Sequence, residues 1–301
     1  MEMRKIEIPS GVPQGSVSGP FLFLVFLNDL LYSLPPTIHF SVFADDIKVY
    51  HHNPHIVQNA INIISDWSVC NELPLAESKT SLLRLGSLNS NQLYFISDSP
   101  ILASSSVRDL GLLTDSSLKF ELHINQKIAL SLLRAKQLLK SFRSSNPAFY
   151  SALFKTYVLP ILEYGSSVYS PPPVSKLSIK LEKPLRYFSK IALQRCNISF
   201  SSYENRLELL NMYSIRNRRL KAQLILLYRM VSGASYFPAL NSFISFAFSS
   251  RRPMLLKCHF PQNNDFFSIT VPIWNSIVRN ISAFLTPSQF EQLVVSSISR
   301  F

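Results

Sequence analysis

The chain has 301 residues and 47% hydrophobic content, which suffices for one large or two modest domains and excludes wholesale disorder. Lysine and arginine outnumber aspartate and glutamate by 30 to 18, so the net charge of +12 favours a polyanionic partner, either nucleic acid or an anionic membrane face. The three cysteines lie far apart without a CxxC pair, which argues against a zinc knuckle or a disulfide framework and fits a reducing intracellular compartment.

The first readable segment is the loop at residues 11–20. Gly11, Pro13 and Gly15 mark a constrained turn, and Ser16 is a good N-cap for a helix predicted over residues 17–32. Backbone N–H groups at such a junction can face a phosphate. A plain helix-capping turn would use the same residues, so the local sequence leaves both interpretations open.

The segment 40–50 predicts a hairpin. Two short runs with alternating apolar residues flank a turn that carries Asp45 and Asp46. Adjacent carboxylates repel each other, and a bound Mg²⁺ would remove that cost because it prefers hard oxygen ligands. An exposed aspartate-rich turn is the alternative, since aspartate is common in turns for local reasons.

The two segments, in this order and at this separation, resemble the reverse transcriptases of non-LTR (LINE-type) retrotransposons. In that family a GVPQGS motif opens a palm helix and a Y/F-ADD hairpin follows it. The resemblance implies that Asp45 and Asp46 are catalytic and bind Mg²⁺ or Mn²⁺. It also implies template or nucleotide contacts at Gly11, Pro13, Gln14, Gly15, Ser16, Phe43 and Ala44.

After the hairpin, Asn53-Pro54 predicts the start of an amphipathic helix that ends near Asn71. The segment 73–80 resembles the LxLNxxKT motif of the family. The resemblance implies that Lys79 helps the departing pyrophosphate as a general acid or as a positive charge. Ala76 departs from the usual asparagine of the motif, which affects the local turn and its nucleotide contacts.

Residues 107–124 follow the VxxLGxxxD…LxFxxHI run that leads from palm to thumb in the family. We interpret Asp115 and His123 as a turn aspartate and a helix-entry histidine rather than as an acid–base pair. A helix is predicted over 121–143 with a basic face. That face is either simply solvated or follows a nucleic-acid backbone, through Lys127, Arg134, Lys136, Lys140 and Arg143.

Three later segments continue the resemblance in order: residues 154–166, 203–228 and the pair Trp274-Asn275. Pro184 falls where the family pattern expects helix, and a proline inside a helix costs about 3 kcal/mol or more. We therefore expect a kinked helix or a drifted sequence there. The charge is also uneven: residues 1–60 hold three basic and five acidic side chains, whereas residues 176–229 hold twelve and three.

The predicted fold is α+β: a partial right-hand polymerase palm over residues 1–100, a palm-to-thumb connection and helical thumb over 101–170, and a basic helical extension over 171–301. In the family the partner aspartate lies on a strand before the GVPQGS motif. Ten residues precede Gly11, and none is aspartate. We therefore expect the fingers and that strand to be absent and the chain to be inactive alone. An endonuclease and a zinc knuckle are not recognised.

The resulting functional prediction is an RNA-directed DNA polymerase of a non-LTR retrotransposon that works by two-metal nucleotidyl transfer. Its partners would be an RNA template, a DNA primer, their duplex and deoxynucleotides, with no membrane. No signal peptide is recognised, so we expect an intracellular protein that is not secreted. The alternative is a non-catalytic, basic, nucleic-acid-binding remnant of a retroelement.

Overall fold

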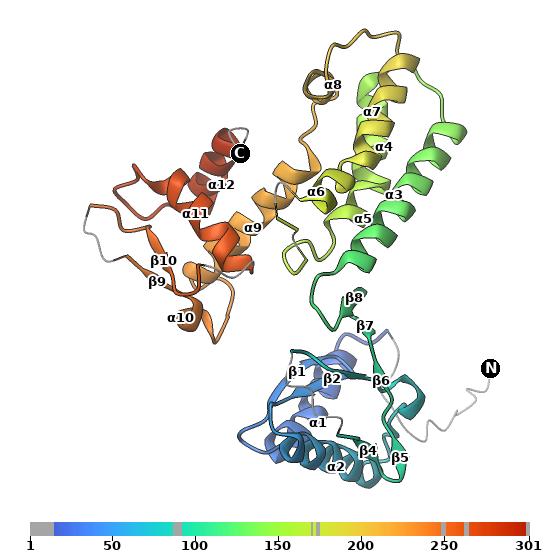
Figure 1. The fold of residues 1–301 in the computed structure, drawn as a ribbon, viewed down its shortest axis with the longest axis vertical. Coiled ribbons are helices and arrows are strands. Elements are labelled where there is room, and N and C mark those ends of the chain that lie inside the picture. The colour runs from blue at the N-terminus through green and yellow to red at the C-terminus, as the bar shows by residue number, and fades with distance from the viewer. Residues whose placement is uncertain are drawn as a thin grey trace, which may run out of the picture. The chain divides into compact units, whose positions relative to one another are not determined.

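The computed structural model describes residues 15–86, 92–169, 171–172, 175–247, 251–261 and 265–298 (Figure 1). The chain forms two compact units. The N-terminal unit holds the described residues up to Val107 together with Asp115–Ser117, and the C-terminal unit holds Arg108–Thr114 and the described residues from Leu118 onward. Helices accompany five two-stranded sheets, which is compatible with the predicted α+β class.

Two helices form the base of the N-terminal unit. Helix α1 covers Gly19–Ser33 and α2 covers Pro54–Cys70. The predicted start of α1 at residue 17 was wrong by two residues: Pro20 occupies the first turn, and the Ser16 hydroxyl accepts the Gly19 N–H at 3.0 Å from outside the helix. The prediction for α2 is confirmed, because Asn53 accepts the His55 N–H at 2.9 Å and the helix ends at Asn71.

The predicted hairpin is also present. Strands β1 (His39–Phe43) and β2 (Asp46–Tyr50) pair antiparallel, from His39 opposite Tyr50 to Phe43 opposite Asp46. Its partly buried Val42, Ile47 and Val49 pack on the core between α1 and α2. In the described part of the chain this sheet has two strands, so both of its edges are unpaired there.

Short elements complete the N-terminal unit. The 3₁₀ turn η1 covers Glu77–Lys79; β3 (Leu82–Leu83) pairs parallel with β6 (Ala103–Ser104), and β4 (Phe95–Ile96) pairs antiparallel with β5 (Ser99–Pro100). One apolar core holds the unit together. Its buried side chains are Leu27, Leu30, Leu34, Ile38, Val57, Ala60, Ile64 and Tyr94.

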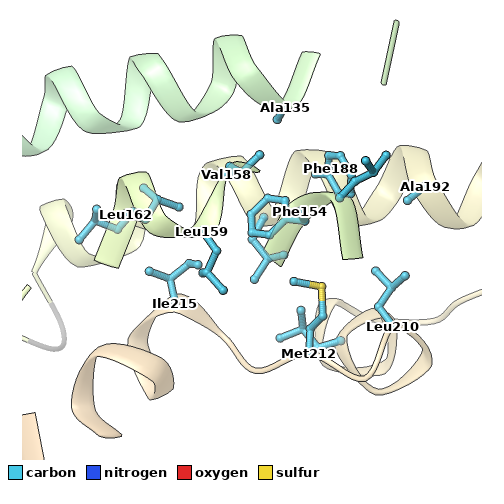
Figure 2. Close-up of a cluster of buried hydrophobic side chains, with 14 of the residues drawn as sticks. Ala135, Phe154, Val158, Leu159, Leu162, Phe188, Ala192, Leu210, Met212 and Ile215 are labelled. Atoms are coloured by element: carbon cyan, nitrogen blue, oxygen red, sulfur yellow. The ribbon is translucent and has the colours of Figure 1, made fainter. Parts of the chain in front are cut away.

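The hairpin of β7 (Ser106–Asp109) and β8 (Leu112–Asp115) leads into a helical bundle. The bundle contains α3 (Glu121–Ser141), α4 (Pro147–Tyr157), α5 (Leu159–Glu163), α6 (Lys176–Leu181), α7 (Lys183–Arg195) and α8 (Tyr203–Leu209). Figure 2 shows part of its core, where Phe154 from α4 and Phe188 from α7 have ring centroids 5.1 Å apart. The predicted helix over 121–143 is present as α3, which ends two residues earlier, and most of its apolar stripe is buried: Ile124, Ile128, Ala135 and Leu139.

The last segment has a core of its own. Helix α9 (Ile215–Val231) precedes α10 (Leu240–Phe243), the antiparallel strands β9 (Ile244–Phe246) and β10 (Leu256–Cys258), α11 (Phe266–Val278) and α12 (Pro287–Ser297). Trp274 is fully buried and donates to the Met254 carbonyl at 2.6 Å. Asn275 pairs with both backbone groups of Leu256, at 2.9 and 2.8 Å, which ties α11 to β10.

The helix that the family pattern predicts around Pro184 is interrupted there, in line with the expected kink: α6 ends at Leu181 and α7 begins at Lys183. The chain turns at Glu182, and Pro184 stands in the first turn of α7, where its missing N–H is harmless. The buried Glu182 carboxylate stabilises this break by accepting the Tyr203 hydroxyl at 2.6 Å and the Arg216 N–H at 2.8 Å.

None of the described helices is both long and apolar enough to span a bilayer.

Candidate functional site

The two aspartates lie at the tip of the β1–β2 hairpin. Because Phe43 pairs with Asp46, the turn itself consists of only Ala44 and Asp45. Both carboxylate residues are exposed. Ala44 has a φ of +51°, a left-handed conformation that costs a residue with a Cβ atom about 1 kcal/mol or more. The fold therefore maintains a tight, mildly strained turn that presents two carboxylates to solvent.

Only one face of the β1–β2 hairpin packs against the N-terminal core. The cross-strand pair Val42–Ile47 lies next to the turn and packs on the N-terminal core, whereas Phe43 is 63% exposed beside the carboxylates. Since side chains alternate along a strand, this register places Phe43 and Asp46 on the face that points away from the core. An exposed aromatic ring and the Asp46 carboxylate thus share one face, and Asp45 is exposed in the adjoining turn.

The loop before α1 is described only in part. Gly11, Pro13 and Gln14 lie outside the described residues. Gly15 has a φ of +81°, which strongly favours glycine, and a Cβ atom added there would meet nothing within 4 Å. The steric space beside Gly15 is therefore open, and Ser16 fixes the entry into α1 through its bond to Gly19.

Lys79 lies at the end of η1 and is exposed. The backbone N–H of Lys79 donates to the backbone carbonyl of Ala76 at 2.9 Å. Ala76, the residue that departs from the family motif, therefore still provides the acceptor that closes this turn. Among the described residues, no hydrogen bond or ion pair joins Lys79 to Asp45 or Asp46. In the described part of the chain, Lys79 is therefore not bonded to either of the two adjacent aspartates.

The carboxylate oxygens at the hairpin tip are ligands of the kind that a hard divalent cation prefers, but only two carboxylates are present. Mg²⁺ typically takes one or two protein carboxylates, with water and substrate phosphates as its other ligands. Asp45 and Asp46 can supply such a pair. Within the described ranges no group of three or more histidine, cysteine, aspartate or glutamate side chains gathers to hold a metal.

Asp115 and His123 have local structural roles. Asp115 accepts the Ser117 N–H at 3.0 Å, and the buried Nδ1 of His123 accepts the Leu113 N–H at 3.1 Å. Burial lowers the pKa of His123 to about 4, and the positive charges of Lys127, Arg108 and Arg219 add to the effect. This histidine is therefore neutral near pH 7.

The basic candidates on α3 differ in exposure. Arg134, Lys136 and Lys140 are exposed, and Arg143 is exposed just beyond the end of the helix. Lys127 is half-buried, with its Nζ 5.9 Å from the centre of the Tyr164 ring. Four of the five predicted backbone contacts are thus available on the surface.

Sequence reasoning missed two polar groups that organise the C-terminal unit. The buried Arg219 donates to the Leu162 carbonyl at 3.1 Å and to the Tyr169 carbonyl, and the neighbouring Arg218 pairs with Glu163. Both join residues 154–169 to the start of α9. The only available signal was that both segments resembled one family.

The comparisons with known proteins agree on a family. The pattern described as reverse transcriptase (RNA-dependent DNA polymerase) matches residues 2–114. The putative 115 kDa protein in type-1 retrotransposable element R1DM of Drosophila melanogaster is 25% identical over 176 residues, which cover 54% of this chain and 17% of that protein. The chain belongs to the reverse transcriptases of non-LTR retrotransposons.

A second relative of this chain is the uncharacterized protein B0403.1 of Caenorhabditis elegans. It is 39% identical over 137 residues, 45% of this chain and 68% of that protein. The chain therefore spans about two thirds of one relative and a small part of the other. No solved structure gives a significant match. Membership of the reverse transcriptases implies, in general, a nucleic-acid template and primer, nucleotides and a divalent metal.

Proposed function

We propose that the β1–β2 hairpin carries metal-binding carboxylates of an RNA-directed DNA polymerase. Asp45, supported by Asp46, would hold Mg²⁺ or Mn²⁺. The bound ions would supply Lewis-acid stabilisation of the charge that develops on the attacking and leaving oxygens. The observation that carries this proposal is the two-residue turn: it exposes both carboxylates on one rigid tip, within the segment that matches the reverse transcriptase pattern.

The neighbouring residues would bind the substrates. Phe43 and Ala44 stand beside the carboxylates, where they would contact the primer end or the incoming nucleotide. Gly15 and Ser16, with Gly11, Pro13 and Gln14 before them, would contact the template base and the nucleotide. Open space at Gly15 supports this role, because it allows a ligand to approach the backbone closely.

The reaction joins the primer 3′-oxygen to the α-phosphorus of a deoxynucleotide and releases pyrophosphate. Lys79 would donate a proton to the departing pyrophosphate or neutralise its charge. Its exposed position at the end of η1 leaves the ammonium group free to meet a ligand. Because Lys79 does not contact the aspartates, the bound nucleotide would have to bridge the two.

The rest of the chain would be arranged as in a right-hand polymerase, with a palm followed by a thumb. Residues 1–100 would form part of the palm, 101–170 the connection and thumb, and 171–301 a basic extension. The exposed Arg134, Lys136 and Lys140 on α3 support a thumb that follows the RNA–DNA backbone. Such contacts carry no sequence information and weaken steeply with salt.

The isolated 301-residue chain should not extend a primer. Two carboxylates on one element form only part of a two-metal cage, and no third acidic, histidine or cysteine ligand joins them among the described residues. The test is template-directed primer extension with an RNA template, a DNA primer, deoxynucleotides and Mg²⁺. Primer extension by this chain would refute the expected inactivity of the chain alone. If Asp45→Ala abolished that extension, the result would also support the assignment of Asp45 as catalytic.

A second candidate function is nucleic-acid binding without catalysis. The exposed basic face of α3 favours it independently of the hairpin. Duplex binding that falls with salt, but is unchanged by Mg²⁺ and by Asp45→Ala, would support this alternative over a polymerase site.

A further inference from the structure

A second ligand site is indicated in the C-terminal unit, within the bundle and separate from the β1–β2 hairpin. An open pocket of about 510 Å³ lies where α3 ends, α4 begins and α7 ends, and Figure 1 shows these three helices packed together. Its lining consists of Arg143, Ser144, Ser145, Tyr150 and Arg195. A water molecule takes a share of about 30 Å³ in the liquid, so the pocket has room for a small anion with its hydration.

The lining offers hydrogen-bond donors and positive charge. Two of the five side chains are guanidinium groups and three are hydroxyls, and none of these described lining residues is acidic. Arg195 is half-buried, and its Nη1 donates hydrogen bonds to the carbonyls of Leu139 and Phe142, the latter at 3.0 Å. Those bonds fix the guanidinium at the end of α3, and its other nitrogens remain as donors.

Tyr150 anchors the loop that carries the two lining serines. Its side chain is fully buried in α4, and its hydroxyl oxygen accepts the Ser144 N–H at 3.1 Å. This bond fixes the backbone directly after Arg143, so Arg143 and Ser145 extend from an anchored loop. Donors that are held in place before a ligand arrives lose less conformational freedom when they bind it.

We propose that this pocket binds a phosphate group. Arginine forks match phosphate oxygens, and charge-assisted hydrogen bonds are roughly twice as strong as neutral ones. A phosphate group offers three strong acceptor oxygens, enough for donors from both arginines and a lining serine, whereas a carboxylate offers two oxygens. The proposal needs no polymerase activity and does not depend on Asp45 or Asp46.

The test is calorimetric titration of the purified full chain with inorganic phosphate at constant ionic strength. We expect saturable binding that weakens about tenfold in Arg143→Gln, which loses one charge-assisted contact. Ser145→Ala, in an exposed lining residue, should weaken binding to a smaller extent. Arg229→Gln is the matched control: it removes one exposed charge from α9 but does not line the pocket, so binding should be unchanged.

A parallel titration with a single-stranded oligonucleotide distinguishes the two sources of phosphate. If Arg143→Gln selectively weakens both ligands, the pocket holds a phosphate of a nucleic-acid strand; if it weakens inorganic phosphate alone, the ligand is a free phosphate. Absence of saturable phosphate binding would overturn the proposal. Equal weakening by Arg143→Gln and Arg229→Gln would also overturn it, because the effect would then come from general surface charge.

Discussion

His123 shows how burial determines what a titratable residue can do. Its ring accepts a backbone N–H through Nδ1, while its buried Nε2 has no hydrogen-bond partner among the described residues. The ring also packs edgewise against Tyr169, with centroids 4.6 Å apart. Protonation would place a charge in this apolar site beside three basic residues. A histidine that resists protonation serves the fold rather than acid–base chemistry.

This burial predicts a pH-dependent stability. The folded pKa of about 4 lies below the ordinary 6.5, so the unfolded chain binds the proton first as the pH falls. The stabilisation is complete above about pH 6.5 and is lost between about pH 6.5 and pH 4, and its full size is on the order of 3 kcal/mol. His123→Asn keeps an acceptor near Leu113 but cannot titrate, so it should flatten this dependence.

The measurement is the free energy of unfolding from urea denaturation at pH 7 and pH 4.5. His55→Asn, at an exposed position in α2, is the matched control and should keep the wild-type slope. Identical pH slopes for wild type and His123→Asn would contradict this account of His123.

At the scale of elements, the sequence predicted those helices and strands whose ends depend on residues close together in the chain. Asn53 before Pro54 marks the start of α2, and the alternation around Asp45 marks the β1–β2 hairpin. For the break between α6 and α7, Pro184 predicted a kink or a drifted sequence, but not the residue that stabilises the break. Its determinant is Glu182, whose two partners, Tyr203 and Arg216, lie 21 and 34 residues further along the chain. Sequence spacing could not show that Pro184 begins a helix.

The Glu182 junction predicts a specific loss of stability. Glu182→Gln keeps one acceptor oxygen and replaces the other with an amide donor, so when that oxygen accepts the Arg216 N–H, the Tyr203 hydroxyl hydrogen loses its acceptor. We expect a loss of about 1–3 kcal/mol in the free energy of unfolding, measured by urea denaturation. Glu208→Gln, on the exposed side of α8, should change stability by less than about 0.5 kcal/mol. Equal effects of the two substitutions would show that the junction does not depend on this carboxylate.

At the scale of the whole molecule, the sequence overstates how much positive charge is free to meet a ligand. Residues 176–229 contain twelve basic side chains, but the buried Arg219 donates to backbone carbonyls and Arg218 pairs with Glu163. A charge count could not separate these internal roles from the exposed side chains of α3. The same limit applies to the candidate site: the motifs located Asp45 and Asp46, but spacing alone could not show whether Lys79 would contact them.

The central claim is that the hairpin tip binds a divalent metal, and Mn²⁺ titration followed by electron paramagnetic resonance tests it most directly. The full chain should bind Mn²⁺ weakly, and Asp45→Asn should abolish that binding because one carboxylate of the pair is removed. Asp66→Asn, an exposed aspartate on α2, is the matched control and should leave binding unchanged. Binding that survives Asp45→Asn, or that is absent from the wild-type chain, would contradict the assignment of this turn as a metal site.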